Sequence, residues 1–359
     1  MRNKKLAGGI VVSALAMALA ACTSVSETPP ASTTAAEPTD TASETAAETS
    51  APAAGGGAYV VVVKATGIGW FDRMEVGVKE WASETGLDAR EEGPAEATNE
   101  GQVSIIQDLI AQKPTAISVV PNDLAGLESV LGQARDAGIV VVSHEAVGIK
   151  NVDIDIEGFE NSAYGAQIME NLGACTGGEG KYVQFVGRLT NGSHMEWVNG
   201  ALEKQKADFP NMTRVEDPIE SEENEETAYN KAKEILQKYP DIKGFEGSAG
   251  TDVVGIARAV EEAGKADSTC VMGTSIPSVA GSYLQSGAID KIFFWDPALA
   301  GKAQLAIAKI LADGGTIEEG TDLGIPGYES LVKLSGADNA FAGNAGVAVD
   351  VTNVDQYNF

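Results

Sequence analysis

Cysteine and histidine are scarce in this chain. Its 359 residues include three cysteines and two histidines, and no two cysteines form a C-x-x-C pair. Protein zinc sites draw most of their ligands from these two residue types. The acidic run "ESEENEE" (220–226) does not have the spacing of a calcium-binding EF-hand loop, and it predicts a solvated loop and helix start. The sequence therefore predicts no metal site.

Motifs of catalysis and of cofactor binding are also missing. In "GIGWFD" the position that a dinucleotide-binding loop fills with its last glycine holds Asp72, and no G-x-x-x-x-G-K phosphate loop occurs. The sequence has no G-x-S-x-G nucleophile elbow, and neither His144 nor His194 has a recognisable nucleophile as partner. We therefore predict no catalytic residue, no cofactor and no enzymatic activity.

Positive charge is in short supply. Lys and Arg number 25 against 52 Asp and Glu, for a formal net charge of −27. Nucleic acids are bound through clustered Lys and Arg, and anionic membranes attract basic patches. This composition argues against nucleic acid, and against an anionic membrane bound through a basic patch, as partners.

The chain also lacks an apolar run long enough to span a membrane, which needs roughly 20 residues. Its one candidate is the amino-terminal "LAGGIVVSALAMALAA", preceded by the basic "MRNKK" and ending in "LAAC" at Cys22. This is the pattern of a secretory signal peptide over residues 1–22. It resembles the bacterial lipoprotein lipobox, which implies cleavage before Cys22 and lipidation of its sulfur; the alternative is an ordinary signal peptide with an incidental cysteine.

Residues 23–57 contain almost no large apolar side chain and are rich in Ser, Thr, Pro, Glu and Ala. Such a segment cannot bury enough apolar surface to offset the entropy of ordering it. It predicts a disordered acidic tether. With the lipid on Cys22, the tether predicts an extracytoplasmic protein anchored to the cell membrane.

From about residue 58 the sequence alternates short β-branched runs with amphipathic segments. The runs "AYVVVV" (58–63), "AISVV" (116–120) and "IVVVS" (139–143) are typical of buried strands, and the intervening apolar residues recur at helical spacing. The same alternation returns between residues 181 and 314. Repeated βαβ units form parallel sheets with helices on both faces. We therefore predict an α/β fold with two doubly wound parallel-sheet lobes.

Polar and aromatic residues follow the predicted strands of both lobes. Ligands of open parallel sheets bind beyond the carboxyl ends of the strands, so facing lobes would bring these residues to one cleft. The candidate residues are Lys64, Trp70, Phe71, Glu145, His194, Ser248, Gly250, Trp295 and Asp296. The flat faces of Trp70 and Phe71, expected in a loop after glycine, suit the C–H faces of a sugar, and Lys64 and Glu145 suit its hydroxyls. Alternatively, the two aromatics are core residues and Lys64 is solvated.

Several stretches carry a resemblance to a known family. They include "VVVVKATGIGWFDRMEVGVKEW", "EEGPAEATNEGQVSIIQDLIAQ", "IFFWDPALAGK" and the final "NVDQYNF". The chain resembles the type I periplasmic sugar-binding proteins of ABC importers, within them the autoinducer-2-binding and rhamnose-binding receptors. The resemblance implies a monomer whose two lobes, joined by a three-crossing hinge, close on a small sugar and dock on permease subunits. The lobes would comprise residues 58–157 with 297–332, and 158–296 with 333–359.

The family's binding positions fall on Lys64, on Glu145 in place of the usual aspartate, and on the Trp295–Asp296 pair. The second-lobe positions of the autoinducer-2 receptors fall on Ser193, His194, Ser248 and Gly250, which leaves that lobe without its carboxylate. A site built for one set of hydroxyls rejects analogues that leave its polar groups unpaired. We therefore expect a pentose, a deoxyhexose such as rhamnose, a polyol or an autoinducer-2-like furanose. A sensor receptor coupled to chemotaxis or a kinase, and an extracytoplasmic enzyme, are the alternatives.

Cys175 and Cys270 remain once Cys22 is assigned to the lipid. Outside the cytoplasm an even pair of cysteines can form a disulfide. Both residues are expected at the amino-terminal edge of the second sheet. The sequence leaves a disulfide and two buried free thiols as alternatives.

Overall fold

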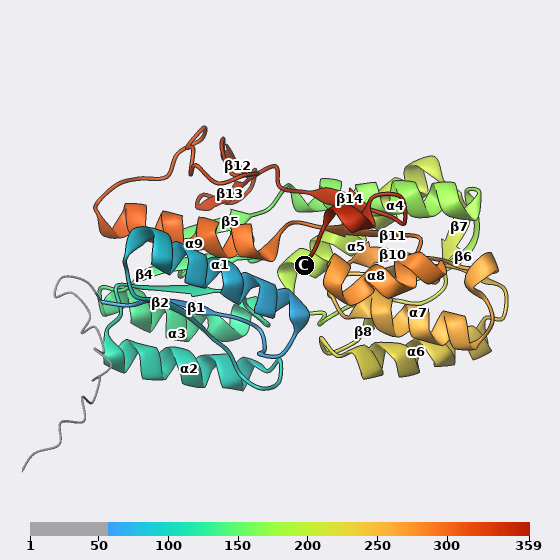
Figure 1. Cartoon of the computed structure of the whole chain (residues 1–359), viewed down its shortest axis with the longest axis horizontal. Helices are drawn as coiled ribbons and strands as arrows, with labels where there is room; N and C mark the ends of the chain where they lie inside the picture. Colours follow the sequence, from blue (N-terminus) through green and yellow to red (C-terminus); the bar gives the residue numbers. More distant parts are fainter. Residues whose placement is uncertain (1–56) are drawn as a thin grey trace, which may run out of the picture. The chain divides into compact units, whose positions relative to one another are not determined.

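The computed structural model describes residues 57–359. The predicted signal peptide (1–22), the lipidation site Cys22 and the predicted tether up to residue 56 lie outside the described residues. Figure 1 shows two sheets, each with helices on both faces. The predicted α/β fold with two parallel-sheet lobes is therefore confirmed.

The first sheet has the strand order β12-β13-β5-β4-β3-β1-β2, and its strands are parallel except for β12. Valines of the first strand alternate between the two faces, and all are fully buried because helices cover both sides. Helices α2 and α3 lie on one face and α1 and α9 on the other (Figure 1). The bounds are β1 (Tyr59–Val62), α1 (Gly69–Thr85), β2 (Ala89–Glu92), α2 (Asn99–Gln112), β3 (Ala116–Val119), α3 (Leu124–Asp136), β4 (Val140–His144), β5 (Ile154–Glu157), α9 (Pro297–Ala312), β12 (Val332–Lys333) and β13 (Ala340–Ala342).

The second sheet has the order β14-β11-β10-β9-β6-β7, with β8 paired to β6 and only β14 antiparallel. Helices α4 and α5 pack on one face, and α6, α7 and α8 on the other (Figure 1). The bounds are α4 (Asn161–Thr176), β6 (Glu179–Val186), α5 (Gly192–Asp208), β7 (Asn211–Arg214), β8 (Ile219–Glu220), α6 (Glu225–Lys238), β9 (Ile242–Gly247), α7 (Asp252–Glu262), η1 (Ala266–Ser268), β10 (Cys270–Thr274), α8 (Pro277–Ser286), β11 (Lys291–Phe294), β14 (Val347–Val349) and η2 (Val354–Gln356).

The chain passes between the two sheets three times: after β5, between β11 and α9, and between β13 and β14. The sequence predicted the last crossing after residue 332. That position is wrong by about ten residues, because β13 pairs with β5 in the first sheet and all three of its residues are buried. The crossing therefore falls after Ala342.

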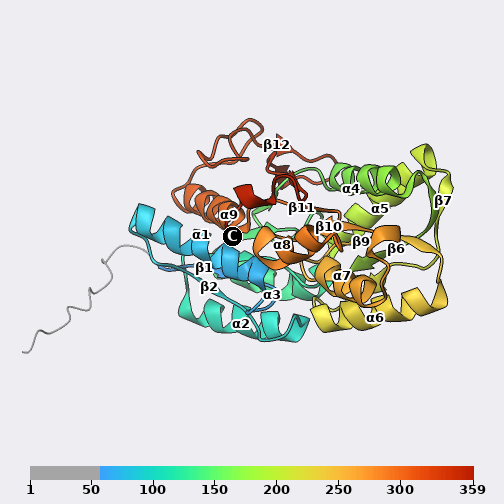
Figure 2. The same ribbon diagram turned by 45° about the vertical axis from the view of Figure 1, so that its right-hand side comes forward.

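Trp70 and Phe71 lie in the first turn of α1, not in a loop as the sequence predicted. The helix begins before these two residues because the carbonyl of Ile68 accepts from the backbone N–H groups of Phe71 and Asp72, which forms the first turn. In Figure 2 this end of α1 lies beside α8, and a Cβ on Gly69 would be 2.8 Å from Val279 Cγ2. Glycine thus allows the first turn of α1 to approach the second lobe.

Cys175, near the end of α4, and Cys270, at the start of β10, are joined by a disulfide. This is one of the two alternatives that the sequence left open. The bridge ties α4 to the amino-terminal edge of the second sheet and joins positions 95 residues apart.

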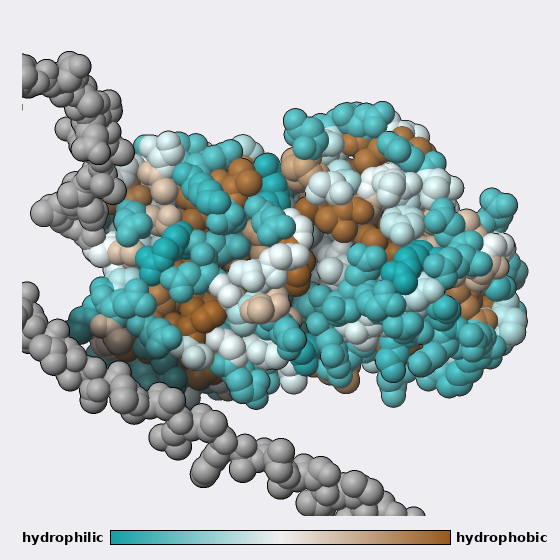
Figure 3. All heavy atoms as spheres, turned by 60° about the horizontal axis from the view of Figure 1, so that its bottom comes forward, coloured by the Kyte–Doolittle hydropathy of each residue, from teal (hydrophilic) through white to brown (hydrophobic). Residues whose placement is uncertain are grey.

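The surface agrees with the acidic composition. On the face drawn in Figure 3, hydrophilic side chains predominate and interrupt the apolar patches. Within residues 57–359, no helix combines the length and the apolar character that crossing a bilayer requires.

The carboxyl group of Glu246, on β9, is fully buried. Gln184 donates to its Oε2 at 3.0 Å, Oε1 has no partner, and burial raises its pKa to about 8. The unfolded chain, with a glutamate pKa of about 4.3, holds this proton less tightly, so stability falls as pH rises between these two values. The fall is at most about 1.4 kcal/mol per pH unit for one group.

We expect Glu246→Gln to flatten the decline in the free energy of unfolding between about pH 5 and pH 8. Burial also raises the pKa values of Asp155 and Asp252, each to about 7, so part of the decline should persist. Urea unfolding at several pH values measures the slope. A variant with the wild-type slope would contradict the assignment to Glu246.

Candidate functional site

A small enclosed cavity lies between the two lobes, at the carboxyl ends of the central strands. Its volume is about 20 Å³, room for about one water molecule. Eight of the ten predicted ligand-binding residues line it. They are Lys64, Trp70, Phe71, Glu145, His194, Ser248, Gly250 and Trp295, and the other lining residues are Ile68, Trp197, Glu223 and Thr274.

Lys64 is the cation of the cavity and is almost completely buried. Its Nζ lies 2.7 Å from Glu145 Oε2 and 3.4 Å from Glu223 Oε1, and the side chains of all three residues are at most 6% exposed. Burial lowers the pKa of Lys64, but the two carboxylates raise it by more, so the lysine is held in its charged form. The interpretation of Lys64 as a solvated residue is wrong.

Gln102 fixes the backbone that presents Lys64. Its amide nitrogen donates to the carbonyls of Val63 (3.1 Å) and Val120 (2.8 Å), at the ends of β1 and β3. Its amide oxygen accepts from Asn122 N, and Asn122 Nδ2 in turn donates to Lys64 O. One buried amide therefore joins both strand ends and sets the position from which the lysine projects.

Glu145 follows β4 in the left-handed backbone region, with a φ of 58°. A non-glycine residue there is strained, at a cost on the order of 1–3 kcal/mol, and such residues cluster at functional sites. Residues 57–359 hold only three other non-glycine residues with positive φ, namely Lys113, Glu222 and Glu223. Two of the four thus supply the carboxylates of the cavity.

His194 enters the cavity from the first turn of α5, where Asn191 caps the helix by accepting from the backbone N–H of His194. The N–H of Gly187 donates to His194 Nδ1 at 3.1 Å, so the proton of the neutral ring is on Nε2. Nε2 lies 3.5 Å from Lys64 Nζ. Burial and the charge of Lys64 both lower the pKa of His194, so it remains a neutral donor.

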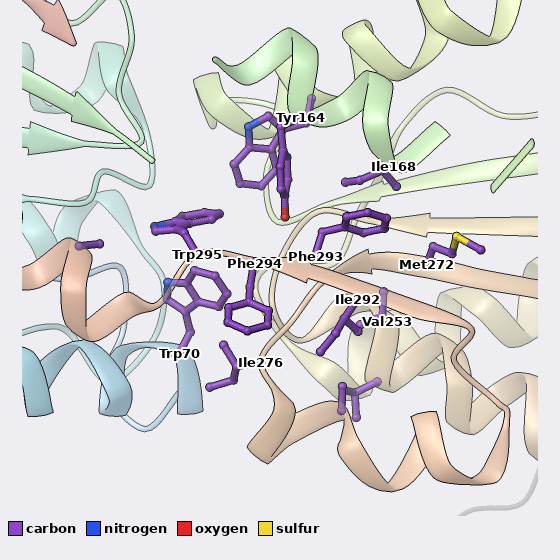
Figure 4. Packing of buried hydrophobic residues seen from close by; sticks show 14 of the residues in the cluster. Trp70, Tyr164, Ile168, Val253, Met272, Ile276, Ile292, Phe293, Phe294 and Trp295 are labelled. Carbon is purple, nitrogen blue, oxygen red and sulfur yellow. The ribbon is translucent and has the colours of Figure 1, made fainter. Parts of the chain in front are cut away.

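Aromatic rings form the walls. The rings of Trp70, from α1, and Trp295, after β11, meet edge to face with centroids 4.7 Å apart (Figure 4). Trp295 is held by His144, whose Nε2 accepts from the indole N–H at 3.0 Å. The indole nitrogen of Trp70 is buried and has no partner. An acceptor on a ligand that reached this nitrogen would satisfy it.

Gly250 brings the second lobe against the first at this wall. A Cβ on Gly250 would lie 3.4 Å from Trp70 Cε3. Two further contacts join the lobes: Arg188 Nε donates to Ala97 O at 3.1 Å, and Thr190 Oγ1 to Asn122 O at 3.4 Å. The lobes are therefore in a closed arrangement.

Ser193 and Asp296 do not line the cavity. Ser193 precedes His194 in the first turn of α5, and its hydroxyl oxygen is buried without a partner. Asp296 caps α9 through the N–H of Ala298 and binds the Arg73 guanidinium with both carboxylate oxygens, at 2.9 and 2.6 Å. Asp296 thus links α1, which carries Arg73, to the second crossing between the lobes.

Four lining residues were missed by sequence reasoning. Trp197 lies three positions after His194 on α5, and helical spacing could have placed it on the same face. Ile68 and Thr274 adjoin predicted segments. Glu223 belongs to the acidic run that was expected to be solvated, and that expectation is wrong for this residue because its side chain contacts Lys64 inside the cavity.

This arrangement is suited to holding a small polar molecule. Lys64 and His194 offer donors, Glu145 and Glu223 offer acceptors, and indole rings cover the faces between them. Within residues 57–359, none of the serines and threonines that line the cavity forms a hydrogen bond with His194. The fold and the site therefore define a two-lobed protein with a polar, aromatic-walled cavity between its lobes.

The comparisons with known proteins identify the family. Residues 59–316 match the model of the periplasmic binding protein domain, and the chain belongs to this family. A D-allose-binding periplasmic protein of Escherichia coli (strain K12) is 26% identical over 261 residues, which cover 69% of this chain and 82% of the relative.

Solved structures share the fold. LsrB from Clostridium saccharobutylicum, in complex with AI-2, has a TM-score of 0.78 at 21% identity, covering 84% of this chain and 100% of that one. A solute-binding protein of an ABC transporter from Clostridium phytofermentas, with bound L-rhamnose, also has a TM-score of 0.78, at 18% identity, covering 85% and 99%.

Proposed function

We propose that this chain is an extracytoplasmic receptor that captures a small sugar or polyol and delivers it to the permease of an ABC importer. The lining of the cavity, which combines the ring of Trp70 with a lysine, two carboxylates and a neutral histidine, is the observation that carries this proposal. A hydroxyl-rich ligand offers acceptors and donors together, and its C–H faces suit the indole walls. The similarity to the D-allose-binding periplasmic protein of Escherichia coli supports this ligand class.

Capture would proceed by closure of the lobes. We divide the chain into a first lobe of residues 58–157 and 297–342, and a second lobe of residues 158–296 and 343–359, on the basis of the sheet to which each strand belongs. Separation of the lobes about the three crossings would open the cavity, and contacts such as Arg188 with Ala97 would form again on closure. The closed form is the one that we expect permease subunits to recognise.

We further propose that the receptor acts as a monomer held outside the cell membrane by a lipid on Cys22. The signal sequence, the lipobox resemblance and the acidic segment 23–57 support this. A tether of this length would let the receptor move between the medium and the permease. The same capture step would serve a sensor, and uptake assays in cells with and without the permease distinguish the two roles.

We expect Trp70→Ala and Glu145→Ala each to weaken sugar binding by about 10- to 100-fold, the loss of 1.4–2.8 kcal/mol. The first removes a wall and a donor, and the second removes the partner nearest to Lys64. A thermal-shift screen of pentoses, deoxyhexoses, hexoses and polyols would identify the ligand, and calorimetry would measure the affinities.

Trp81→Ala is the matched control, because Trp81 is buried in the same helix as Trp70 but does not line the cavity. It should lower stability and leave the affinity of the folded protein unchanged. Unchanged affinity in both Trp70→Ala and Glu145→Ala would place the site elsewhere. Turnover of a sugar by the wild-type protein would favour the enzyme alternative.

A further inference from the structure

Glu223 is the one buried glutamate of the acidic segment 220–226. The run 220–226 holds five glutamates, and Glu222 on one side of Glu223 and Asn224 on the other are exposed. Glu223 is 9% exposed, and its carboxylate lies 3.4 Å from Lys64 Nζ in the other lobe. Only this glutamate of the run reaches the cavity.

The backbone around Glu223 is strained in a way that directs the side chain inward. Glu222 and Glu223 have φ values of 60° and 56°, two consecutive non-glycine residues in the left-handed region. The segment is held there by Ser221 N and Glu222 N, which donate to Val186 O and Gly187 O at 2.8 Å each. Strain that the surrounding structure maintains is characteristic of functional positions.

Gly187 leaves the space that the carboxylate occupies. A Cβ at Gly187 would lie 2.2 Å from Glu223 Oε1, so no larger residue fits without displacing Glu223. The same Gly187 donates its N–H to His194 Nδ1. The end of β6 therefore orients two cavity groups of the second lobe at once.

The charged groups of the cavity do not balance, because two carboxylates face one lysine. Glu145 already pairs with Lys64 at 2.7 Å, so Glu223 adds a second carboxylate to a single lysine, and His194 is neutral. Arg188, a further cation, lies with Glu223 at a larger hollow of about 450 Å³. An anionic group entering the inner cavity would meet an excess of negative charge.

Glu223 also stands between the two hollows. It lines the outer hollow together with Ile68, and these two residues are shared with the inner cavity of about 20 Å³. A sugar ring does not fit in a space for about one water molecule. Entry therefore requires the carboxylate of Glu223 to leave Lys64, either by lobe opening or by a side-chain movement.

We propose that Glu223 is the specificity-determining carboxylate of the second lobe: in the closed arrangement it stands at Lys64 where a ligand hydroxyl binds, and it rejects ligands that carry a negative charge. The selection part of this proposal rests on the proposed capture of a sugar or polyol. The structural part of the proposal is the Lys64–Glu223 contact between the lobes, and it does not depend on what the protein captures.

The structural part is tested in protein to which no sugar has been added. Nitroxide labels on Gln107→Cys, in α2, and Lys231→Cys, in α6, report the distance between exposed helices of the two lobes (Figure 1), in a full-length Cys22→Ala chain. We expect Glu223→Ala to shift the distance distribution toward longer values. Glu222→Ala, the exposed neighbour with the same backbone conformation, should not. A distribution unchanged by Glu223→Ala would overturn this part.

The selection part is tested with matched pairs of neutral and acidic ligands. The probes are D-allose and L-rhamnose, paired with D-alluronic acid and L-mannuronic acid, which carry a carboxylate at C6 and keep the sugar ring, and calorimetry gives the ratio of the two affinities. We expect the wild type to prefer the neutral member at least 100-fold, and Glu223→Gln to reduce that ratio at least tenfold. Glu222→Gln should leave the ratio within twofold.

A ratio in Glu223→Gln within twofold of the wild type, or a wild type that prefers the acids, would overturn selection by Glu223. If the wild type binds none of the neutral probes or of the wider sugar screen, the proposed function fails instead. The distance measurement then still decides whether Glu223 holds the lobes together.

Discussion

Replacing Lys64 by methionine is expected to reduce sugar affinity at least 100-fold and to lower the free energy of unfolding by about 3–5 kcal/mol. Methionine has a similar length but leaves Glu145 and Glu223 buried with no cation between them. Breaking a buried ion pair by removing one partner is costly because the remaining charge is uncompensated. Calorimetry measures the affinity, and urea unfolding measures the stability.

A second substitution separates the two effects. Lys64→Met combined with Glu145→Gln removes one of the uncompensated charges, so we expect it to recover part of the stability and none of the affinity. Lys79→Met serves as the control, because the Lys79 side chain is 65% exposed and pairs with Glu75 on its own helix. Wild-type affinity in Lys64→Met would remove the lysine from the site.

Gly165→Ala is expected to lower the free energy of unfolding by about 3 kcal/mol. Gly165 lies on α4 where this helix crosses α5, and an added Cβ would be 1.8 Å from the backbone oxygen of Trp197. Backbone atoms cannot rotate away as a side chain can, so the two helices must move apart. Because Trp197 lines the cavity, ligand affinity should fall as well.

Gly281→Ala is the matched control for this substitution. Gly281 is also in the middle of a helix, α8, but its nearest neighbour to an added Cβ is Val354 Cγ2 at 3.8 Å, an ordinary contact. Alanine is the better helix former by roughly 0.5–1 kcal/mol, so this variant should be slightly more stable than the wild type. Urea unfolding of the two variants side by side makes the comparison, and equal stabilities would contradict it.

The sequence predicted the part of the site that depends on strand order alone. Lys64 and Glu145 follow uninterrupted valine runs, which mark buried parallel strands, and the carboxyl ends of such strands meet at one edge. That rule needs no knowledge of contacts between the lobes. It places a residue at the edge and does not say whether its side chain turns toward the cavity, which is why Asp296 was expected at the ligand although it binds Arg73.

The contribution of Glu223 was not predictable in this way. Five glutamates in seven residues have the same local preferences, and a left-handed backbone on a non-glycine residue leaves no local pattern in the sequence. Only the room beside Gly187 and the lysine in the other lobe single out one of the five. β13 was missed for a related reason, since three residues are too few to display an alternating pattern and their burial comes from pairing with distant β5.

The disulfide has a consequence for how the protein is made. Cys175 and Cys270 both lie in the half of the molecule built on the second sheet, and the sheet-forming residues of the other half contain no cysteine. A reducing host cytoplasm would therefore weaken one half and spare the other, which favours partly folded, aggregation-prone product. Export to an oxidising compartment is the better route for recombinant production.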